Sequence, residues 1–284
     1  MYTARITRTH PTAFVILIDQ SGSMEEPTSF CGERMSKAEA VARATNMLIS
    51  ELINRCRRED GCRDYFDIAV IGYSGRGIAS LLGTRQTFLR PTQLAGMDVP
   101  QTTLTKERRL PNGQTVLSTM RQKQWIQPTA HADTPMCAAL TRAYRLVRDW
   151  CRQRGNQSSY PPTIFNITDG EASDGSDSEL IEIADKIRSV GTEDGKTLLI
   201  NLHITSHAEL PRTLFPSSEE ELPDEPYARL LYRMSSPIPE TYNEHISDLR
   251  DGATAFPVRG ISYNASATEL VGMMNIGTVS ATIT

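Results

Sequence analysis

Three oxygen-bearing side chains follow the first apolar run of the chain at alternate positions. After the apolar residues 14–18, the sequence reads Asp19-Gln20-Ser21-Gly22-Ser23. At this spacing one carboxylate and two hydroxyls can converge if the chain turns sharply, and Gly22 permits such a turn. Oxygen donors, few of them charged, are the ligands that hard divalent cations take in proteins. The segment therefore predicts one part of an oxygen-lined cation site.

Two further oxygen donors lie far along the sequence, each beside a predicted element. Thr134 precedes a predicted helix, and Asp169 ends the apolar run that begins at Thr163. Ligand sites in open α/β sheets lie outside the carboxyl ends of the strands, so we expect Asp19 and Asp169 to be neighbours. Taken singly, such residues equally well cap helices or bind backbone amides. Their joint arrival at one sheet edge favours a site.

The elements that position these residues follow from hydrophobic periodicity. Continuous apolar runs predict buried strands, whereas apolar stripes at a spacing of three and four predict helices. Ser36 and Glu39 form a capping-box pattern at the start of the first helix, and Thr134 with Pro135 gives an N-cap followed by a first helical residue. The predicted strands cover residues 14–18, 67–73, 78–82, 163–170, 197–205 and 253–258. The predicted helices cover residues 36–56, 134–151, 176–187, 227–234, 240–249 and 266–275.

This alternation predicts an α/β fold, a doubly wound and mostly parallel sheet with helices on both faces. We expect a single domain over residues 10–284 with two insertions. The first, about 84–130, contains an Asn112-Gly113 hairpin signal between two strand-like runs. Trp125 and Ile126 are expected to anchor it to the body. The second, about 206–250, is rich in Pro and Glu.

The joint pattern of Asp19, Ser21, Ser23, Thr134 and Asp169, in this order and element context, resembles the metal-ion-dependent adhesion site of the von Willebrand factor A family. That family includes the integrin inserted domains. Thr168-Asp169-Gly170-Glu171 is similar to its second acidic motif. The resemblance extends over nearly the whole chain apart from the two insertions.

The resemblance implies that Ser21, Ser23 and Thr134 bind Mg²⁺ or Mn²⁺ directly, while Asp19 and Asp169 act largely through water or hydrogen bonds. A cation held mainly by neutral hydroxyls and water lacks one strong ligand, which a partner's Asp or Glu supplies. The implied function is metal-dependent protein–protein interaction without catalysis. The family further suggests an intracellular adaptor whose partners belong to AAA+ ATPase assemblies or to stress and defence operons.

Two features of this chain depart from the family pattern. The residues before Thr134 are His131-Ala132-Asp133 where the family has glycines, so Asp133 would add a carboxylate near the cation. The loop from Met24 to Gly32 is long, and its Glu25 and Glu26 would border the site and repel acidic partners. We hypothesise that this loop and the first insertion select the partner.

Two alternative functions remain open on the sequence. In a metal-dependent hydrolase, Asp19, Asp133 and Asp169 would hold the cation, and a bound water would attack a phosphate ester. Against it, the chain has no Gly-rich phosphate loop and no Lys within the motifs, and His131 is the only nearby candidate base. The other alternative is a scaffold of the same fold that binds no metal.

Composition narrows the class of protein further. The formal net charge of −4 over 284 residues gives no basic field for nucleic acid. No apolar run approaches the roughly 18 residues of a membrane-spanning helix, and the first residues lack the apolar stretch of a signal peptide. Five cysteines without a CxxC pair favour reduced thiols, two of them, Cys56 and Cys137, on buried helix faces. We therefore expect a cytoplasmic protein.

Overall fold

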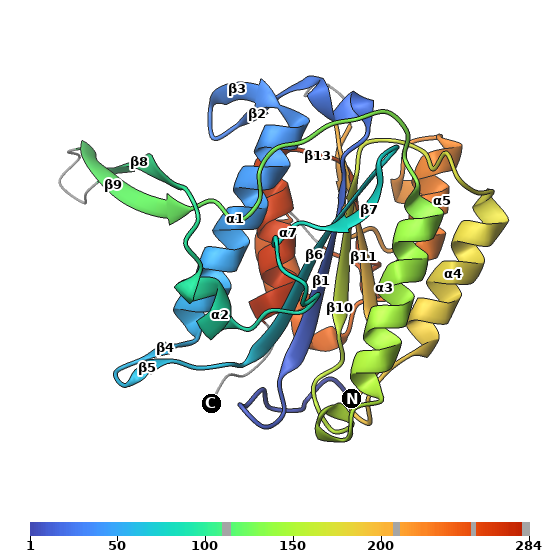
Figure 1. Ribbon diagram of the computed structural model, residues 1–284. Coiled ribbons are helices and arrows are strands. Elements are labelled where there is room, and N and C mark those ends of the chain that lie inside the picture. Colours follow the sequence, from blue (N-terminus) through green and yellow to red (C-terminus); the bar gives the residue numbers. More distant parts are fainter. Residues whose placement is uncertain (110–114, 207–210, 251–253, 280–284) are drawn as a thin grey trace.

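The computed structural model of the chain describes residues 1–109, 115–206, 211–250 and 254–279. Within them, a seven-stranded sheet forms the centre of the molecule, in the order β12-β13-β11-β10-β1-β6-β7 (Figure 1). β1, β6, β10, β11 and β13 are parallel, and β7 and β12 join the two edges in the antiparallel direction. The strands are β1 (Thr12–Asp19), β6 (Phe66–Ser74), β7 (Gly77–Ser80), β10 (Thr163–Thr168), β11 (Leu198–Ile204), β12 (Thr213–Leu214) and β13 (Ile261–Ala265).

Helices cover both faces of this sheet, which confirms the predicted doubly wound α/β fold. Alternate residues of β1 belong to different cores: Phe14, Ile16 and Ile18 pack on one face, and Val15 and Leu17 on the other. The period of two and the continuous apolar run are both explained by this double burial. The first face carries α1 (Lys37–Arg55), α2 (Pro91–Gly96), α6 (Asn243–Leu249) and α7 (Ala267–Val279); the second carries α3 (Met136–Cys151), α4 (Asp177–Ser189) and α5 (Pro226–Met234).

The order of the strands reverses between β1 and β10. From β1 the chain adds β6 and β7 on one side, and it later adds β10, β11 and β13 on the other. Helices that connect strands on opposite sides of such a point leave a crevice at the carboxyl ends of the two central strands. Asp19 is the last residue of β1, and Asp169 directly follows β10, so both lie at this switch point.

Local signals in the sequence account for most element ends. Ser36 is the N-cap of α1, and its side chain accepts a hydrogen bond from the Glu39 amide at 3.1 Å, as predicted. The stretch expected as a plain loop after Met24 contains more structure. It holds a 3₁₀ turn, η1 (Gly22–Glu25), and an antiparallel hairpin of β2 (Pro27–Phe30) and β3 (Glu33–Ser36).

The strand predicted over residues 253–258 is wrong, because the structure places the last strand, β13, at Ile261–Ala265. β13 lies between β11 and β12, where the backbone must offer donors to two neighbours. Pro257 has no amide proton, so the segment that contains it is poorly suited to an interior strand. Residues 251–253 lie outside the described residues.

Residues 84–130, predicted as the first insertion, contain α2 and a two-stranded ribbon of β8 (Gln101–Arg109) and β9 (Thr115–Lys123), which pair with each other and project from the body (Figure 1). The Asn112-Gly113 turn predicted for it lies outside the described residues. At its base the Trp125 indole donates to the Leu94 carbonyl at 3.0 Å, and the Asn46 amide bonds both main-chain groups of Ile126 at 2.9 Å. Trp125 and Ile126 are thus the predicted anchor.

The second insertion contains β12, η3 (Glu219–Glu221), α5, η4 (Glu240–Tyr242) and α6, so the two short helices expected there are confirmed. Small elements elsewhere are β4 (Arg57–Arg58), β5 (Gly61–Cys62) and η2 (Arg154–Asn156).

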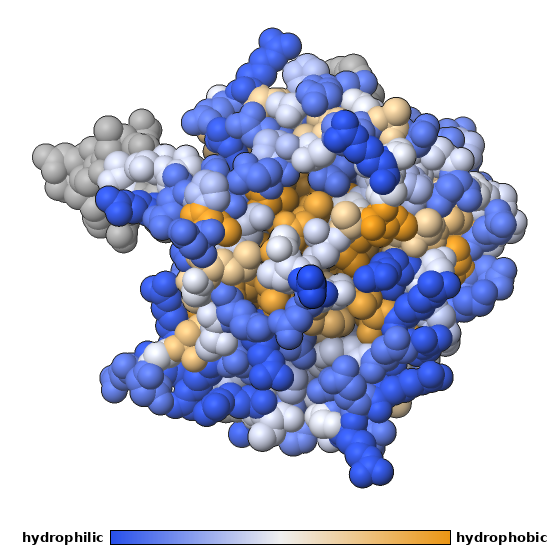
Figure 2. All heavy atoms as spheres, in the orientation of Figure 1, coloured by the Kyte–Doolittle hydropathy of each residue, from blue (hydrophilic) through white to orange (hydrophobic). Residues whose placement is uncertain are grey.

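Apolar residues gather in the middle of the face seen in Figure 2, surrounded by hydrophilic ones. All five cysteines are unpaired thiols, and Cys56 and Cys137 are buried as expected. In the part of the chain that the structure describes, no helix combines the length and apolar character needed to cross a membrane.

Candidate metal centre

The loop after β1 turns sharply, as the spacing of its oxygens requires. Asp19 is fully buried, and its Oδ1 accepts a hydrogen bond from the Ser21 amide at 2.8 Å. η1 then returns the chain so that the Ser21 and Ser23 hydroxyl oxygens lie 3.1 Å apart. One carboxylate and two hydroxyls therefore meet at the end of β1.

The end of β10 closes this group from the neighbouring strand. The Ser23 hydroxyl donates to Asp169 Oδ1 at 2.7 Å, and the Thr168 hydroxyl donates to Asp19 Oδ2 at 2.9 Å. Four of the five predicted residues are thus joined in one hydrogen-bonded group, together with Thr168. Asp169 sits where the sequence placed it, beside the end of β1.

Thr134 lies on a loop packed against this group. The His131 amide donates to the Gln20 carbonyl at 2.6 Å, and a Cβ built on Gly22 would meet Ala132 Cα at 3.9 Å. Thr134 itself is buried, and its main chain exchanges two hydrogen bonds with Ser173, each at 2.9 Å. Among the described hydrogen bonds, none joins Thr134 to the other four residues.

The predicted N-cap at Thr134 is wrong by one residue. α3 begins at Met136 with Pro135 as its N-cap residue, and no side chain of the cap residue bonds the helix. The carboxylate of Asp174 supplies the cap from the loop after β10, because its two oxygens accept from the Cys137 and Ala138 amides at 2.9 Å each. This leaves the Thr134 hydroxyl without a capping role.

The three acidic residues named as modulators lie at different places. Asp133 is exposed, has a left-handed φ of 68°, and directs its Oδ2 towards Gly75, 3.1 Å from where a Cβ on that glycine would lie. It makes no hydrogen bond to the group around Asp19 in the described structure. Glu25 is exposed at the end of η1. Glu26, by contrast, is part of a charged cluster at the site.

Lys37, which the motifs in the sequence do not include, also reaches this group. Its Nζ donates to Asp169 Oδ2 at 2.9 Å and to Glu26 Oε2 at 2.8 Å, with the lysine side chain only 5% exposed. The signal for it was present in the sequence. Lys37 heads the apolar stripe of α1, four residues before Val41, in a position where a charge is unusual without a partner.

Asp19 differs from Asp169 in having no cation beside it. Burial raises its pKa to about 6, opposed by hydrogen bonds from Ser21 and reinforced by the nearby Asp169 carboxylate. No Lys, Arg or His of the described chain forms an ion pair with it. The centre therefore holds one carboxylate that is paired with a cation and one that is not.

An aromatic layer lies next to the group. The Tyr227 hydroxyl donates to the Gly170 carbonyl, and its ring meets His203 edge to face with centroids 5.8 Å apart. His203 stacks on Tyr263 at 4.3 Å. Burial lowers the pKa of His203 to about 4, so this imidazole is neutral at pH 7. All three rings of this aromatic layer are buried.

The donor set fits Mg²⁺ or Mn²⁺. Octahedral coordination at about 2.0–2.1 Å places adjacent ligand oxygens roughly 3 Å apart. The Ser21–Ser23 hydroxyl pair at 3.1 Å and the Ser23–Asp169 pair at 2.7 Å match this edge length. Among the described residues, no cluster of three or more His, Cys, Asp or Glu side chains could hold a metal. Any cation here must therefore depend on the hydroxyls.

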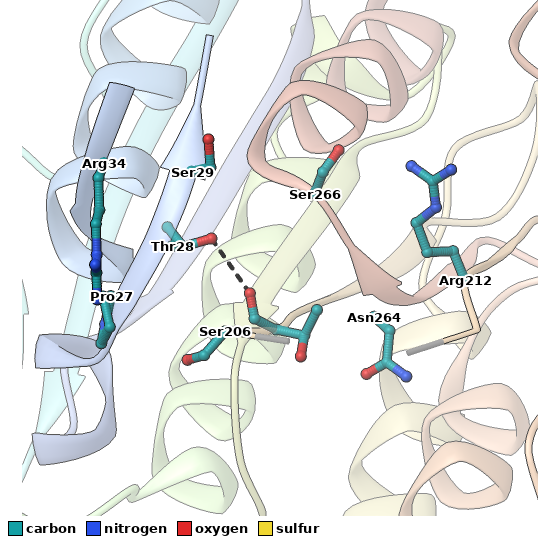
Figure 3. A pocket seen from close by; sticks show the side chains of 9 residues that line it. Pro27, Thr28, Ser29, Arg34, Ser206, Arg212, Asn264 and Ser266 are labelled. Atoms are coloured by element: carbon teal, nitrogen blue, oxygen red, sulfur yellow. Dashed lines mark hydrogen bonds between the residues drawn. The ribbon is translucent and has the colours of Figure 1, made fainter. Parts of the chain in front are cut away.

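A pocket of about 360 Å³ lies between the β2–β3 hairpin and the end of β13 (Figure 3). The β2–β3 hairpin forms one wall, where Thr28 donates to the Thr205 carbonyl at 3.3 Å, and the end of β13 and the start of α7 form another. Ser206 on its lining donates to Glu26 Oε2 at 2.8 Å. The pocket is thus linked through Glu26 and Lys37 to Asp169.

Comparison with known proteins gives no relative by sequence: no protein-family model and no curated protein matches the chain. Among solved structures, the von Willebrand factor domain of the type V pilus tip protein Mfa5 from Porphyromonas gingivalis is similar at 9% identity, with 97% of each chain covered and a TM-score of 0.44. An uncharacterised membrane-spanning protein from Vibrio fischeri is similar at 12% identity over 68% of this chain and 71% of its own, with a TM-score of 0.25.

Proposed function

We propose that this chain is a metal-dependent protein interaction module whose cation, Mg²⁺ or Mn²⁺, is completed by an acidic side chain of the partner. The observation that carries the proposal is Asp19. This buried carboxylate has no cation beside it in the described structure, and it shares a hydrogen-bonded group with two hydroxyls at the edge length of an octahedron. A divalent cation would supply the missing positive charge.

The roles of the residues follow from their chemistry. Ser21 and Ser23 would hold the cation through neutral hydroxyls, with Thr134 as a third such ligand. Asp19 and Asp169 would orient these ligands or bound water through hydrogen bonds. Neutral direct ligands leave the cation electrophilic and short of one strong ligand, which favours coordination by an incoming carboxylate. The chain's own residues thus leave a coordination position of the cation for a partner's Asp or Glu.

The segments around the centre determine which partner protein binds. The β2–β3 hairpin directly follows η1, and the β8–β9 ribbon projects from the same molecule without pairing to another described strand. Both present surface that a protein partner can contact while its acid reaches the metal. We infer an adaptor role. In it, the metal binds an acidic group of the partner protein, and the projecting ribbon contacts the partner and contributes to its selection.

Calorimetric titration with Mg²⁺ and Mn²⁺ tests the proposal. Wild type is expected to bind, and Asp19→Ala to lose binding. Asp177→Ala serves as the matched control, because it removes an exposed carboxylate in the first turn of α4. Absence of binding by wild type contradicts the metal-dependent model. Phosphatase turnover that Asp19→Ala abolishes would instead favour a hydrolase.

A further inference from the structure

Lys37 places a fixed positive charge inside the candidate metal centre. Its ammonium is held between Asp169, whose side chain is fully buried, and Glu26, whose side chain is 56% exposed. Helix α1 fixes the lysine backbone at the first position after its N-cap. Because both ion pairs are short and the lysine is buried, the charge cannot move far from the centre.

The charge balance of the centre depends on this lysine. Asp19, Asp169 and Glu26 bring three negative charges, and Lys37 reduces the total to −2. A divalent cation then makes the loaded centre neutral. Without Lys37, the loaded centre would keep one negative charge and would repel an incoming carboxylate. Lys37 also neutralises Glu26, which the sequence alone suggested as a residue that repels acidic partners.

We propose that Lys37 is a built-in counter-ion that lowers the affinity of the centre for its metal and in return lets the loaded centre accept an acidic group. The inference rests on the proposed function, and it names a specificity-determining residue outside the predicted ligand set. It gives the partner group a chemical class, a carboxylate, which the open coordination position favours and which the neutral loaded centre does not repel.

The alternative role for Lys37 is to hold Asp169 in place without acting by its charge. The two roles predict opposite effects on metal affinity when Lys37 is removed. If Lys37 only positions Asp169, removing it or its partner Glu26 should weaken metal binding in both cases. If Lys37 acts by charge, removing the lysine strengthens metal binding, and removing Glu26 weakens it, because the lysine charge is then less compensated.

The test uses Mn²⁺ alone as the probe, in calorimetric titrations of the full chain. Lys37→Met is expected to bind Mn²⁺ about tenfold tighter than wild type, and Glu26→Gln about threefold weaker. Lys186→Met is the control, because it removes the same charge from an exposed i,i+4 pair with Glu182 on α4. It should bind as wild type does. Unchanged or weaker binding by Lys37→Met overturns the inference.

A second measurement addresses the acidic partner directly. Acetate, as a stand-in for an Asp or Glu side chain, is titrated into the Mn²⁺-loaded proteins and followed by water-proton relaxation. Loaded wild type should bind acetate about tenfold more tightly than loaded Lys37→Met. Equal acetate affinity contradicts the inference.

Glu26→Gln keeps the inference testable if Lys37→Met does not fold. It leaves the Lys37–Asp169 pair intact and changes a half-exposed side chain. Unchanged or tighter Mn²⁺ binding by this variant again overturns the inference. If wild type and both variants all fail to bind Mn²⁺, the proposed function itself fails; if wild type binds and only the signs are wrong, the proposed function stands.

Discussion

Asp19 is buried at the end of β1, where it accepts hydrogen bonds from the Ser21 amide and the Thr168 hydroxyl but lacks a neighbouring cation. Its charged form is therefore unfavourable in the metal-free protein. Asp19→Asn keeps the shape of the side chain and one acceptor, and it removes the charge. In metal-free protein at pH 7.5, we expect the free energy of unfolding of this variant to exceed that of wild type by about 1 to 3 kcal/mol. Urea unfolding measures the difference.

Asp169→Asn is the matched comparison, because the Asp169 carboxylate forms an ion pair with the Lys37 ammonium. Removing its charge leaves a buried lysine without its closest buried partner, so this variant should lose about 2 to 4 kcal/mol. Both variants should bind metal poorly. Destabilisation by Asp19→Asn as large as that by Asp169→Asn would contradict the distinction between a paired and an unpaired carboxylate.

The pH dependence of stability gives a second prediction at this scale. The pKa of Asp19 is raised and that of His203 is lowered, so the two groups change the stability in opposite directions as the pH rises. Burial raises the Asp19 pKa from 3.8 to about 6, so the folded state binds the proton more tightly and stability falls as pH rises through that window. Burial lowers the His203 pKa from 6.5 to about 4, so its contribution is complete above pH 6.5 and is lost as pH falls towards 4. The two slopes partly cancel.

Single variants should separate the two slopes in metal-free protein. Relative to wild type, Asp19→Asn should gain stability more steeply as pH rises from about 4 to 6, because only the His203 contribution remains. His203→Gln should show the opposite change of slope. Unfolding free energies at half-unit pH steps measure both. Parallel pH profiles for wild type and both variants would contradict these pKa shifts.

At the scale of elements, the loop after β10 controls the start of α3. Asp174 accepts from two α3 amides, and Ser173 exchanges hydrogen bonds with Thr134. The same loop therefore caps the helix and holds the candidate ligand. Asp174→Ala should lower the unfolding free energy by about 1 to 2 kcal/mol and weaken Mn²⁺ binding, because the Thr134 loop is no longer fixed.

Ser176→Ala provides the control for this prediction. Ser176 and Glu179 form the capping box of α4, so the substitution should cost about 1 kcal/mol as well. Among the described hydrogen bonds, the Ser176 side chain joins neither α3 nor Thr134, and Mn²⁺ affinity should therefore stay unchanged. Equal loss of metal affinity in the two variants would show that general destabilisation, rather than the Thr134 loop, governs binding.

The predictability of elements follows from how completely their residues are buried. β1, β10 and β11 are buried on both faces and mostly apolar, so their sequences admit few other structures and predict the strands within a few residues. The β2–β3 hairpin is mostly exposed, and its pairing leaves little trace in hydrophobic pattern. Its presence depends on tertiary context that a loop-like composition does not reveal.

The predictability of the candidate site also depends on which contacts the fold fixes. Asp19, Ser21, Ser23 and Asp169 could be predicted as neighbours because strand ends in a doubly wound sheet fix their positions. The place of Lys37 on the apolar stripe of α1 indicates that it is buried, but its pairing with Asp169 could not be predicted, because that contact depends on how α1 docks on the sheet. Asp174 as the cap of α3 was missed for a similar reason, since its 37-residue separation from Cys137 is bridged only in the folded chain.

At the scale of the whole molecule, the β8–β9 ribbon can be removed without disturbing the core. Its two ends already meet, because the Gln124 amide donates to the Pro100 carbonyl at 2.8 Å. The anchors at Trp125 and Ile126 lie outside it. Among the described residues, replacing 101–123 by a short Gly-Ser linker loses the Lys123 hydrogen bonds to the α2 end and the packing of β9 with its buried Gln122 against α1. We expect a cost of about 1 to 2 kcal/mol.

The ribbon-deleted protein should therefore bind Mn²⁺ as wild type does but retain fewer partner proteins. The measurement compares proteins that co-purify with each form in Mg²⁺ and are released by a chelator. Asp19→Ala serves as the complementary control, because it keeps the ribbon and removes the metal. If partners need both contacts, each change alone should release them, since two weak contacts on one rigid body gain affinity from their linkage. Chelator-sensitive partners that remain bound after ribbon deletion would place partner selection elsewhere, with the β2–β3 hairpin as the next segment to exchange.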